Sequence, residues 1–206
     1  MGKRKFIKEY VEPIVIAVLI ALFVRTFIVQ AFKIPSGSME PTLLVGDYLL
    51  VNKFLYGTRI PFTDTKILRL KEPQRGDIIV FIYPKDQSKD FIKRVIGQEG
   101  EKVEIVQNKI YINDQLIDDP WGHFSEKNPW ARYLPSIENF GPVVVPKNSV
   151  LVLGDNRDNS LDSRFWGFVT LDEVKGKAFI LYFSLDWNSK GLVNKIRWTR
   201  IGKLIR

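Results

Sequence analysis

The segment Ile34–Phe54, IPSGSMEPTLLVGDYLLVNKF, places Ser38 between two prolines and just before a long apolar stretch. Pro35 and Gly37 describe a constrained bend that turns the next side chain outward. An outward serine can serve as a nucleophile if a base lies beside it. The alternative is a turn serine or a helix N-cap, although the capping-box position three residues on is Pro41, which has no carboxylate. Both interpretations stay open at this point.

A base for Ser38 is hard to find among the usual residue types. The chain has one histidine, His123, and no cysteine, which excludes disulfides, thiolate nucleophiles and sites of several His or Cys metal ligands. We expect no metal and no cofactor. In DFIKRVIG, strand alternation places Phe91, Lys93 and Val95 on one face. Apolar neighbours would desolvate Lys93, and burial can lower a lysine pKa from about 10.4 by up to about 3–5 units. The alternative is that Lys93-Arg94 marks a strand edge.

A third polar stretch, GDNRDNSLDSRFWG, covers residues 154–167. A calcium loop counted from Asp155 would have Arg157 at position 3, Ser160 at position 6 instead of glycine, and Trp166 at position 12 instead of glutamate. The stretch therefore predicts either an Asx-turn loop or a buried network of hydrogen bonds and ion pairs that orients a neighbouring group. The cluster directly follows the apolar run SVLVLG, which favours the network.

The rest of the chain must position these residues, and its pattern past Ala31 is mostly β. With 206 residues, of which 45% are hydrophobic and 26% charged, one globular domain with an appendage is expected. The fold class we predict is mostly β, a coiled antiparallel β-sheet or barrel-like domain. Two tight hairpins should turn at Gln107-Asn108 and Asn113-Asp114. Residues 118–146 are expected to be an irregular insertion. The expected strands are DYLLVNKFLY, DIIVFIY, DFIKRVIG, EKVEIVQNKIYINDQLI, SVLVLGD and GKAFILYFSL.

The N-terminus predicts a membrane segment. A basic start, residues 1–10, precedes an uncharged apolar run from Pro13 to Val24. If the side chain of Arg25 reaches the membrane interface, the apolar run can be extended to a transmembrane anchor over residues 11–30. By the positive-inside rule, the N-terminus would be cytoplasmic and residues 31–206 extracytoplasmic. The alternatives are a cleaved signal peptide with VQA at 29–31 as its small-x-small site, and a buried soluble helix.

The net charge of +8 is concentrated at the two ends. Residues 9–186 carry 21 of the 31 basic side chains and all 23 acidic ones, so the body of the chain is nearly neutral. This distribution fits a protein at a membrane surface better than one that binds nucleic acid. The basic C-terminal tail, residues 187–206, could dock on anionic lipid, or it could be an ordinary closing strand or helix.

Taken together, the motifs resemble those of bacterial type I signal peptidases, also called leader peptidases. The motifs that carry the resemblance occur in the family's order, and they are PSGSMEPTL with GDYLLVNK, RGDIIVF, FIKRVIGQEGE and GDNRDNSLDSRFWG. The resemblance implies a membrane-anchored Ser/Lys endopeptidase of the cell membrane, with Ser38 as nucleophile and Lys93 as general base. Its substrates would be exported preproteins, cleaved after small residues of the Ala-x-Ala kind.

The resemblance also implies roles for the surrounding residues. Ser36 would supply a hydroxyl to an oxyanion hole completed by the backbone N–H of Ser38, and Ser160 would orient Lys93. Arg75 and Asp77 would form a structural turn. The supporting ionic network would consist of Arg94, Asp155, Asp162 and Arg164. Shallow substrate pockets would be lined by Phe32, Ile34, Pro35, Val80, Phe91 and Ile92.

Two other functions remain possible from the sequence. One is a self-cleaving repressor-type Ser/Lys peptidase, against which the apolar run at 14–24 argues, because such a protein would be soluble. The other is a catalytically inactive, membrane-tethered binding or scaffold protein with the same β fold. The presence of Ser38, Lys93 and Ser160 argues against the scaffold.

Overall fold

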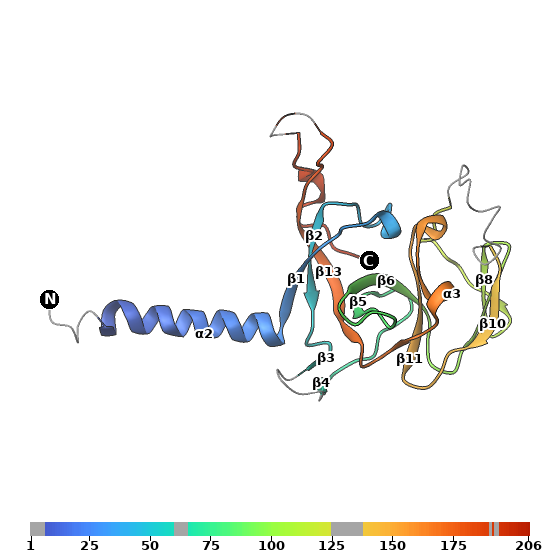
Figure 1. Ribbon diagram of the computed structural model, residues 1–206, viewed down its shortest axis with the longest axis horizontal. Helices are drawn as coiled ribbons and strands as arrows, with labels where there is room; N and C mark the ends of the chain where they lie inside the picture. Colours follow the sequence, from blue (N-terminus) through green and yellow to red (C-terminus); the bar gives the residue numbers. More distant parts are fainter. Residues whose placement is uncertain (1–6, 60–65, 125–137, 190, 192–193) are drawn as a thin grey trace.

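The computed structural model describes residues 7–59, 66–124, 138–189, 191 and 194–206 of the chain (Figure 1). It shows one long N-terminal helix followed by a body of antiparallel strands, which confirms the predicted fold class. The strands are β1 (Val29–Lys33), β2 (Asp47–Asn52), β3 (Tyr56–Arg59), β4 (Lys66–Arg69), β5 (Ile78–Ile82), β6 (Asp90–Gly97), β7 (Lys102–Val106), β8 (Lys109–Ile112), β9 (Gln115–Leu116), β10 (Phe140–Val144), β11 (Ser149–Leu153), β12 (Val169–Thr170) and β13 (Val174–Ser184). The short helical segments are η2 (Gly37–Met39), η3 (Arg157–Asn159), α3 (Ser163–Trp166) and η4 (Trp198–Arg200).

The N-terminal helix projects away from the β body (Figure 1). It consists of a π-helical start, η1 (Ile7–Val11), and α2 (Glu12–Phe27), with Pro13 in the first turn, where its missing N–H costs nothing. Its 21 residues span about 32 Å, enough to cross a bilayer core. None of its residues is buried, so its apolar side chains are not covered by the β body. The helix begins at Ile7, before the expected anchor at 11–30, and it ends at Phe27, because Val29 and Gln30 already pair with β2.

A seven-stranded antiparallel sheet with the order β1-β2-β13-β5-β6-β11-β12 carries Lys93 on β6, while Ser38 lies in η2 between β1 and β2 and the polar stretch 154–167 follows β11. This order joins strands far apart in the sequence, because β13 inserts between β2 and β5. In the part of the chain that the structure describes, no ladder connects β1 to β12, so the sheet is coiled but not a closed barrel. The strand that carries Lys93, β6, pairs with β5 on one side and β11 on the other. Lys93 and Arg94 therefore lie on an interior strand and not at a sheet edge.

A separate four-stranded sheet, β10-β7-β8-β9, contains the two predicted hairpins. Both central residues of each turn have positive φ, at Gln107 and Asn108 and again at Asn113 and Asp114, as tight two-residue hairpins require. The turn prediction is thus confirmed. Part of the region 118–146, which was expected to be irregular, is a regular strand. Residues 140–144 form β10, which pairs with β7. Residues 125–137 of that region lie outside the described residues.

The core consists of three hydrophobic clusters, which fix the strands against one another. One includes Ile34, Met39 and Leu43 beside β2 and β13, and so anchors the segment on both sides of Ser38. A second packs Phe81, Val95 and Trp166, with Phe91 partly buried at its border. The third joins the two larger sheets through residues such as Ile96, Val103 and Leu151. The three sequence motifs are therefore held by packing and not by local structure alone.

Candidate active site

Ser38 and Lys93 are brought into direct contact. The Nζ atom of Lys93 lies 2.6 Å from Oγ of Ser38, across 55 positions of sequence. Ser38 is in the short helical turn η2, which begins after the Pro35-Ser36 bend, while Lys93 is in the middle of β6. Ser38 is 8% exposed and Lys93 3%. A buried hydroxyl in hydrogen-bond contact with a buried amine is the geometry that a nucleophile and its base require.

Burial changes the charge state of Lys93. Desolvation lowers the pKa of Lys93 from 10.5 to about 8, with Asp162 and Asp155 acting in the opposite direction and Arg164 in the same one. At pH 7 a pKa of about 8 leaves about a tenth of the amine neutral, against about one part in 3,000 for an ordinary lysine. Lys93 also donates to the carbonyl oxygen of Ile92, at 3.1 Å, which fixes the direction of the side chain. The neutral amine can accept a proton from Ser38.

Two buried ion pairs fix the loop 154–167, one to the neighbouring strand β6 and one within the loop itself. Arg94 donates to Asp155 through Nε at 2.8 Å and Nη2 at 2.6 Å, and both side chains are fully buried. Arg164 forms a second two-bond pair with Asp162, at 2.9 Å for each bond. The four charged residues named from the sequence thus form two separate ion pairs. Because Arg94 follows Lys93 on β6, the first pair ties the strand of the base to this loop.

The same loop also holds the backbone at Gly37 and Ser38. The backbone N–H of Asn156 donates to the carbonyl oxygen of Ser38 at 3.1 Å. The side-chain amide of Asn156 donates to the carbonyl oxygen of Gly37 at 3.0 Å. A β-carbon on Gly154 would lie 2.5 Å from the Ser38 carbonyl oxygen and 2.1 Å from Oγ of Ser160. Only glycine allows the loop to approach the nucleophile this closely.

Ser160 lies beside Lys93 in the same cleft but does not form the expected hydrogen bond. Its hydroxyl is buried and has no hydrogen-bond partner among the described residues. A buried hydroxyl without a partner is costly and marks a place where a ligand or a reorientation would satisfy it. Ser36 is exposed at the mouth of the cleft, and its side chain does not cap η2.

The turn predicted at Arg75 and Asp77 braces β6 from the other side. Arg75 donates to the carbonyl oxygen of Ile96 at 2.9 Å and to Glu101 at 2.5 Å. Asp77 accepts from Tyr56 and from Lys177. Burial, followed by the contact with Asp77, raises the pKa of the Tyr56 hydroxyl, which therefore stays protonated as a donor.

A cleft of about 540 Å³ opens in front of the Ser38–Lys93 pair. Of the six residues expected to form substrate pockets, it is lined by Pro35, Phe91 and Ile92. Ile34 and Val80 are instead buried in a hydrophobic core cluster, and Phe32 packs against the same cluster. Sequence reasoning missed several lining residues, although they lie in or beside the motifs of Lys93 and Ser160. These are Asp90, Asp158, Asn159, Leu161 and Phe165.

Comparison with known proteins gives one consistent family. A family model described as "Signal peptidase, peptidase S26" matches residues 7–183. A signal peptidase I of Pseudomonas aeruginosa is 36% identical over 98% of this chain and 81% of its own length. A signal peptidase I of Aquifex aeolicus is also 36% identical, over 86% of this chain and 84% of its own length. A crystal structure of a signal peptidase I from Enterococcus faecalis is 32% identical, with a TM-score of 0.42 over 52% of this chain and 97% of that one.

Proposed function

The chain belongs to the signal peptidase family, peptidase S26, and we propose that it removes signal peptides from exported preproteins with Ser38 as nucleophile and Lys93 as general base. The observation that carries the proposal is the 2.6 Å contact between a buried serine and a buried lysine, in front of an open cleft. The family membership supplies the substrate class. The intact pair argues against the inactive scaffold, and the apolar helix Ile7–Phe27 argues against a soluble repressor-type peptidase.

The proposed reaction has two steps. Neutral Lys93 accepts the Ser38 proton as Oγ attacks the scissile carbonyl carbon, and the ammonium then gives this proton to the leaving amine. Water, deprotonated by Lys93, hydrolyses the resulting acyl-enzyme. The backbone N–H of Ser38 and the hydroxyl of Ser36 are proposed to donate to the oxyanion. Ser160 is proposed to accept from Lys93 once its hydroxyl turns toward the amine, which would give this buried group a partner.

Membrane attachment places this site near its substrates. The apolar helix and the family indicate a membrane-anchored protein. We propose that the helix is retained, that it lies in the cell membrane with the basic N-terminus in the cytoplasm, and that the β body, residues 31–206, is extracytoplasmic. Confinement to the membrane surface would raise the effective concentration of precursors, whose apolar segments lie in the same bilayer.

The substrate class is tested with full-length protein in detergent and a purified precursor carrying an Ala-x-Ala site. We expect cleavage after the last alanine, identified by the mass of the released mature chain, because the cleft must accept small side chains next to the scissile bond. A matched precursor with the final alanine replaced by phenylalanine should be cleaved at least about 100-fold more slowly, as expected for a poor fit to the transition state. Equal cleavage of both precursors would contradict the proposed specificity.

The pH dependence follows from the pKa of Lys93. Only the neutral amine can accept the Ser38 proton, so kcat/KM should rise about tenfold per pH unit below pH 8 and level off above it. The pKa is lowered in the folded protein, so the folded state binds fewer protons than the unfolded state between pH 8 and 10.5. This group therefore contributes increasing stability as the pH rises through that window. An initial-rate profile from pH 6 to 10 measures the acid limb, and a profile that is flat between pH 6 and 8 would exclude Lys93 as the base.

A further inference from the structure

The last part of the chain, residues 195–206, forms an edge segment that we call the C-terminal strap. β5 pairs with β13 only over Val174–Lys177. Beyond Lys177, the strap pairs with the same edge of β13. The backbone of Leu181 donates to the carbonyl oxygen of Lys203 at 2.9 Å and accepts from Gly202 at 2.8 Å. Ile205 is buried in the cluster that contains Met39 and Leu43. The strap is therefore part of the folded body and lies close to the nucleophile.

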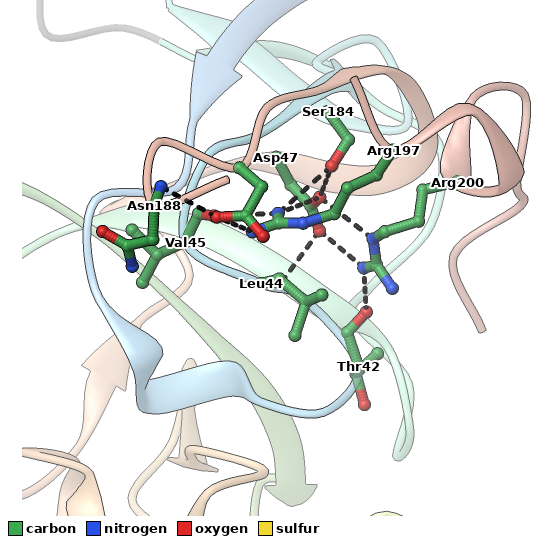
Figure 2. A network of polar contacts seen from close by, with 9 residues as sticks. Thr42, Leu44, Val45, Asp47, Ser184, Asn188, Arg197 and Arg200 are labelled. Carbon is green, nitrogen blue, oxygen red and sulfur yellow. Dashed lines mark hydrogen bonds and ion pairs between the residues drawn. The ribbon is translucent and has the colours of Figure 1, made fainter. Parts of the chain in front are cut away.

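Two arginines of the strap reach a buried carboxylate, Asp47 (Figure 2). Asp47 is fully buried at the start of β2. Arg200 donates to it through Nε at 3.0 Å and Nη2 at 2.5 Å, and Ser184 donates at 2.6 Å. Arg197 lies 3.8 Å from the same carboxylate. A buried carboxylate is tolerated only when it is paired and hydrogen-bonded, so Asp47 requires the strap.

The same arginines also hold residues 37–46, which we call the nucleophile loop because it contains Ser38. Besides its two bonds to Asp47, Arg200 donates to the carbonyl oxygen of Thr42 at 2.9 Å. Arg197 donates to the carbonyl oxygen of Val45 at 3.0 Å. Asp47 accepts from the backbone N–H of Leu44 at 2.8 Å. Three points of the loop are thus fixed by one carboxylate and two guanidinium groups (Figure 2).

Thr42 connects this cluster to the catalytic network. Its carbonyl oxygen accepts from Arg200, while its hydroxyl donates to Asp155 at 2.6 Å. Asp155 is the partner of Arg94, the residue after Lys93. The nucleophile loop is therefore held from one side by the strap and from the other by the strand of the base. Ser38 lies four residues before Thr42 in this loop, and Asn156, the neighbour of Asp155, binds its carbonyl oxygen.

We propose that Arg200 is a positioning residue for this reaction, which fixes the nucleophile loop through Asp47 and Thr42 so that Ser38 stays within hydrogen-bond reach of Lys93. The inference rests on the proposed function. Arg200 does not line the catalytic cleft and acts only through the loop. Its planar fork makes the three bonds at once, and a lysine in its place would supply the charge without this geometry.

The test compares Arg200→Ala and Arg200→Lys with the wild type, as full-length chains in detergent with one precursor. A displacement of about 1 Å at a reacting group can cost about 100-fold in rate. We therefore expect Arg200→Ala to lower kcat by about 10–100-fold with KM within about twofold, and Arg200→Lys to give an intermediate kcat. If Arg200→Ala fails to fold, Arg200→Lys decides the question, since it keeps a positive charge near Asp47.

Two matched controls separate positioning from a general loss of stability. Lys203→Ala removes an exposed strap cation and should behave as wild type. Ile110→Val removes one buried methyl-sized group from β8 in the four-stranded sheet, away from the nucleophile loop, and it should lower the unfolding midpoint without changing kcat per folded molecule. A kcat of folded Arg200→Lys and Arg200→Ala within twofold of wild type overturns the inference. So does an equal fall in kcat for Ile110→Val.

Hydrogen exchange gives a second readout that does not depend on turnover. Amide exchange of residues 37–46, followed by mass spectrometry, should become at least about tenfold faster in the Arg200 variants, because their loop opens more easily. It should be unchanged in Ile110→Val. Unchanged loop exchange in the Arg200 variants overturns the inference. Absence of precursor cleavage by folded wild-type protein would instead contradict the proposed function, and the exchange result would still decide whether Arg200 fixes the loop.

Discussion

Ser38→Ala and Lys93→Met should each reduce precursor cleavage by at least about 10⁴-fold, because removal of either member of a nucleophile–base pair removes nearly the whole effect of the pair. The double variant should be no worse than either single variant, for the same reason. Initial rates of precursor cleavage should be compared at pH 9. Wild-type Lys93 is mostly neutral at this pH, so the wild-type rate is high and the largest decrease can be measured.

The same two variants should remain folded, and this distinguishes loss of chemistry from loss of structure. Methionine has nearly the length of lysine, and Lys93 is 3% exposed, so Lys93→Met removes the cost of burying a charge. We expect its free energy of unfolding to equal or exceed that of the wild type. Ser38→Ala loses one buried hydrogen bond, worth about 1 kcal/mol.

Lys109→Met is the matched control for Lys93→Met, since Lys109 is an exposed lysine on β8. It should cleave at the wild-type rate. Substantial cleavage by folded Lys93→Met would mean that another group is the base. A folded wild-type protein that cleaves no precursor would favour the scaffold alternative.

The second large effect concerns the buried ion pair of Arg94 and Asp155. Asp155→Asn should lower the free energy of unfolding by about 3–5 kcal/mol, because it leaves the guanidinium of Arg94 buried without its counter-charge. Both side chains are fully buried, and Thr42 also donates to Asp155. For a domain of this size, the loss corresponds to a decrease of about 6–20 °C in the unfolding midpoint, measurable by thermal or urea denaturation in detergent.

Asp172→Asn provides the control for this prediction. It breaks the ion pair with Arg69, whose members are 31% and 75% exposed in their side chains, and it should cost at most about 1 kcal/mol. Replacing both Arg94 and Asp155 by Met and Leu should recover part of the loss, because no charge is then left unpaired. If Asp155→Asn and Asp172→Asn shift the midpoint equally, the buried pair does not stabilise the loop as argued here.

The local features of this protein could be predicted because local patterns determine them. The apolar run near the N-terminus predicted a helix, and the turn residues Gln107-Asn108 and Asn113-Asp114 predicted two hairpins. The alternation around Lys93 predicted its apolar neighbours Phe91 and Val95, which both pack in one cluster. Periodicity and turn chemistry act within a few residues, so a single sequence contains them in full.

The pocket residues were harder to predict, because burial depends on what covers a strand. Ile34 and Val80 are apolar residues that lie near Ser38 and Lys93 in the predicted motifs, but both are core residues. Asp90 and Phe165 line the cleft instead. Apolar character alone does not say whether a side chain faces substrate or another strand.

The sequence by itself determined the candidate catalytic residues, the motifs that contain them, the membrane-length helix and the mostly β class. Only the tertiary structure decided that Lys93 lies on an interior strand within 2.6 Å of Ser38, that the Ser160 hydroxyl has no hydrogen-bond partner among the described residues, and that Arg200 pairs with Asp47 across 153 positions. These contacts depend on the order in which strands pair and on the insertion of β13 between β2 and β5. Strand order is set by the packing of the whole core, and no local pattern contains it.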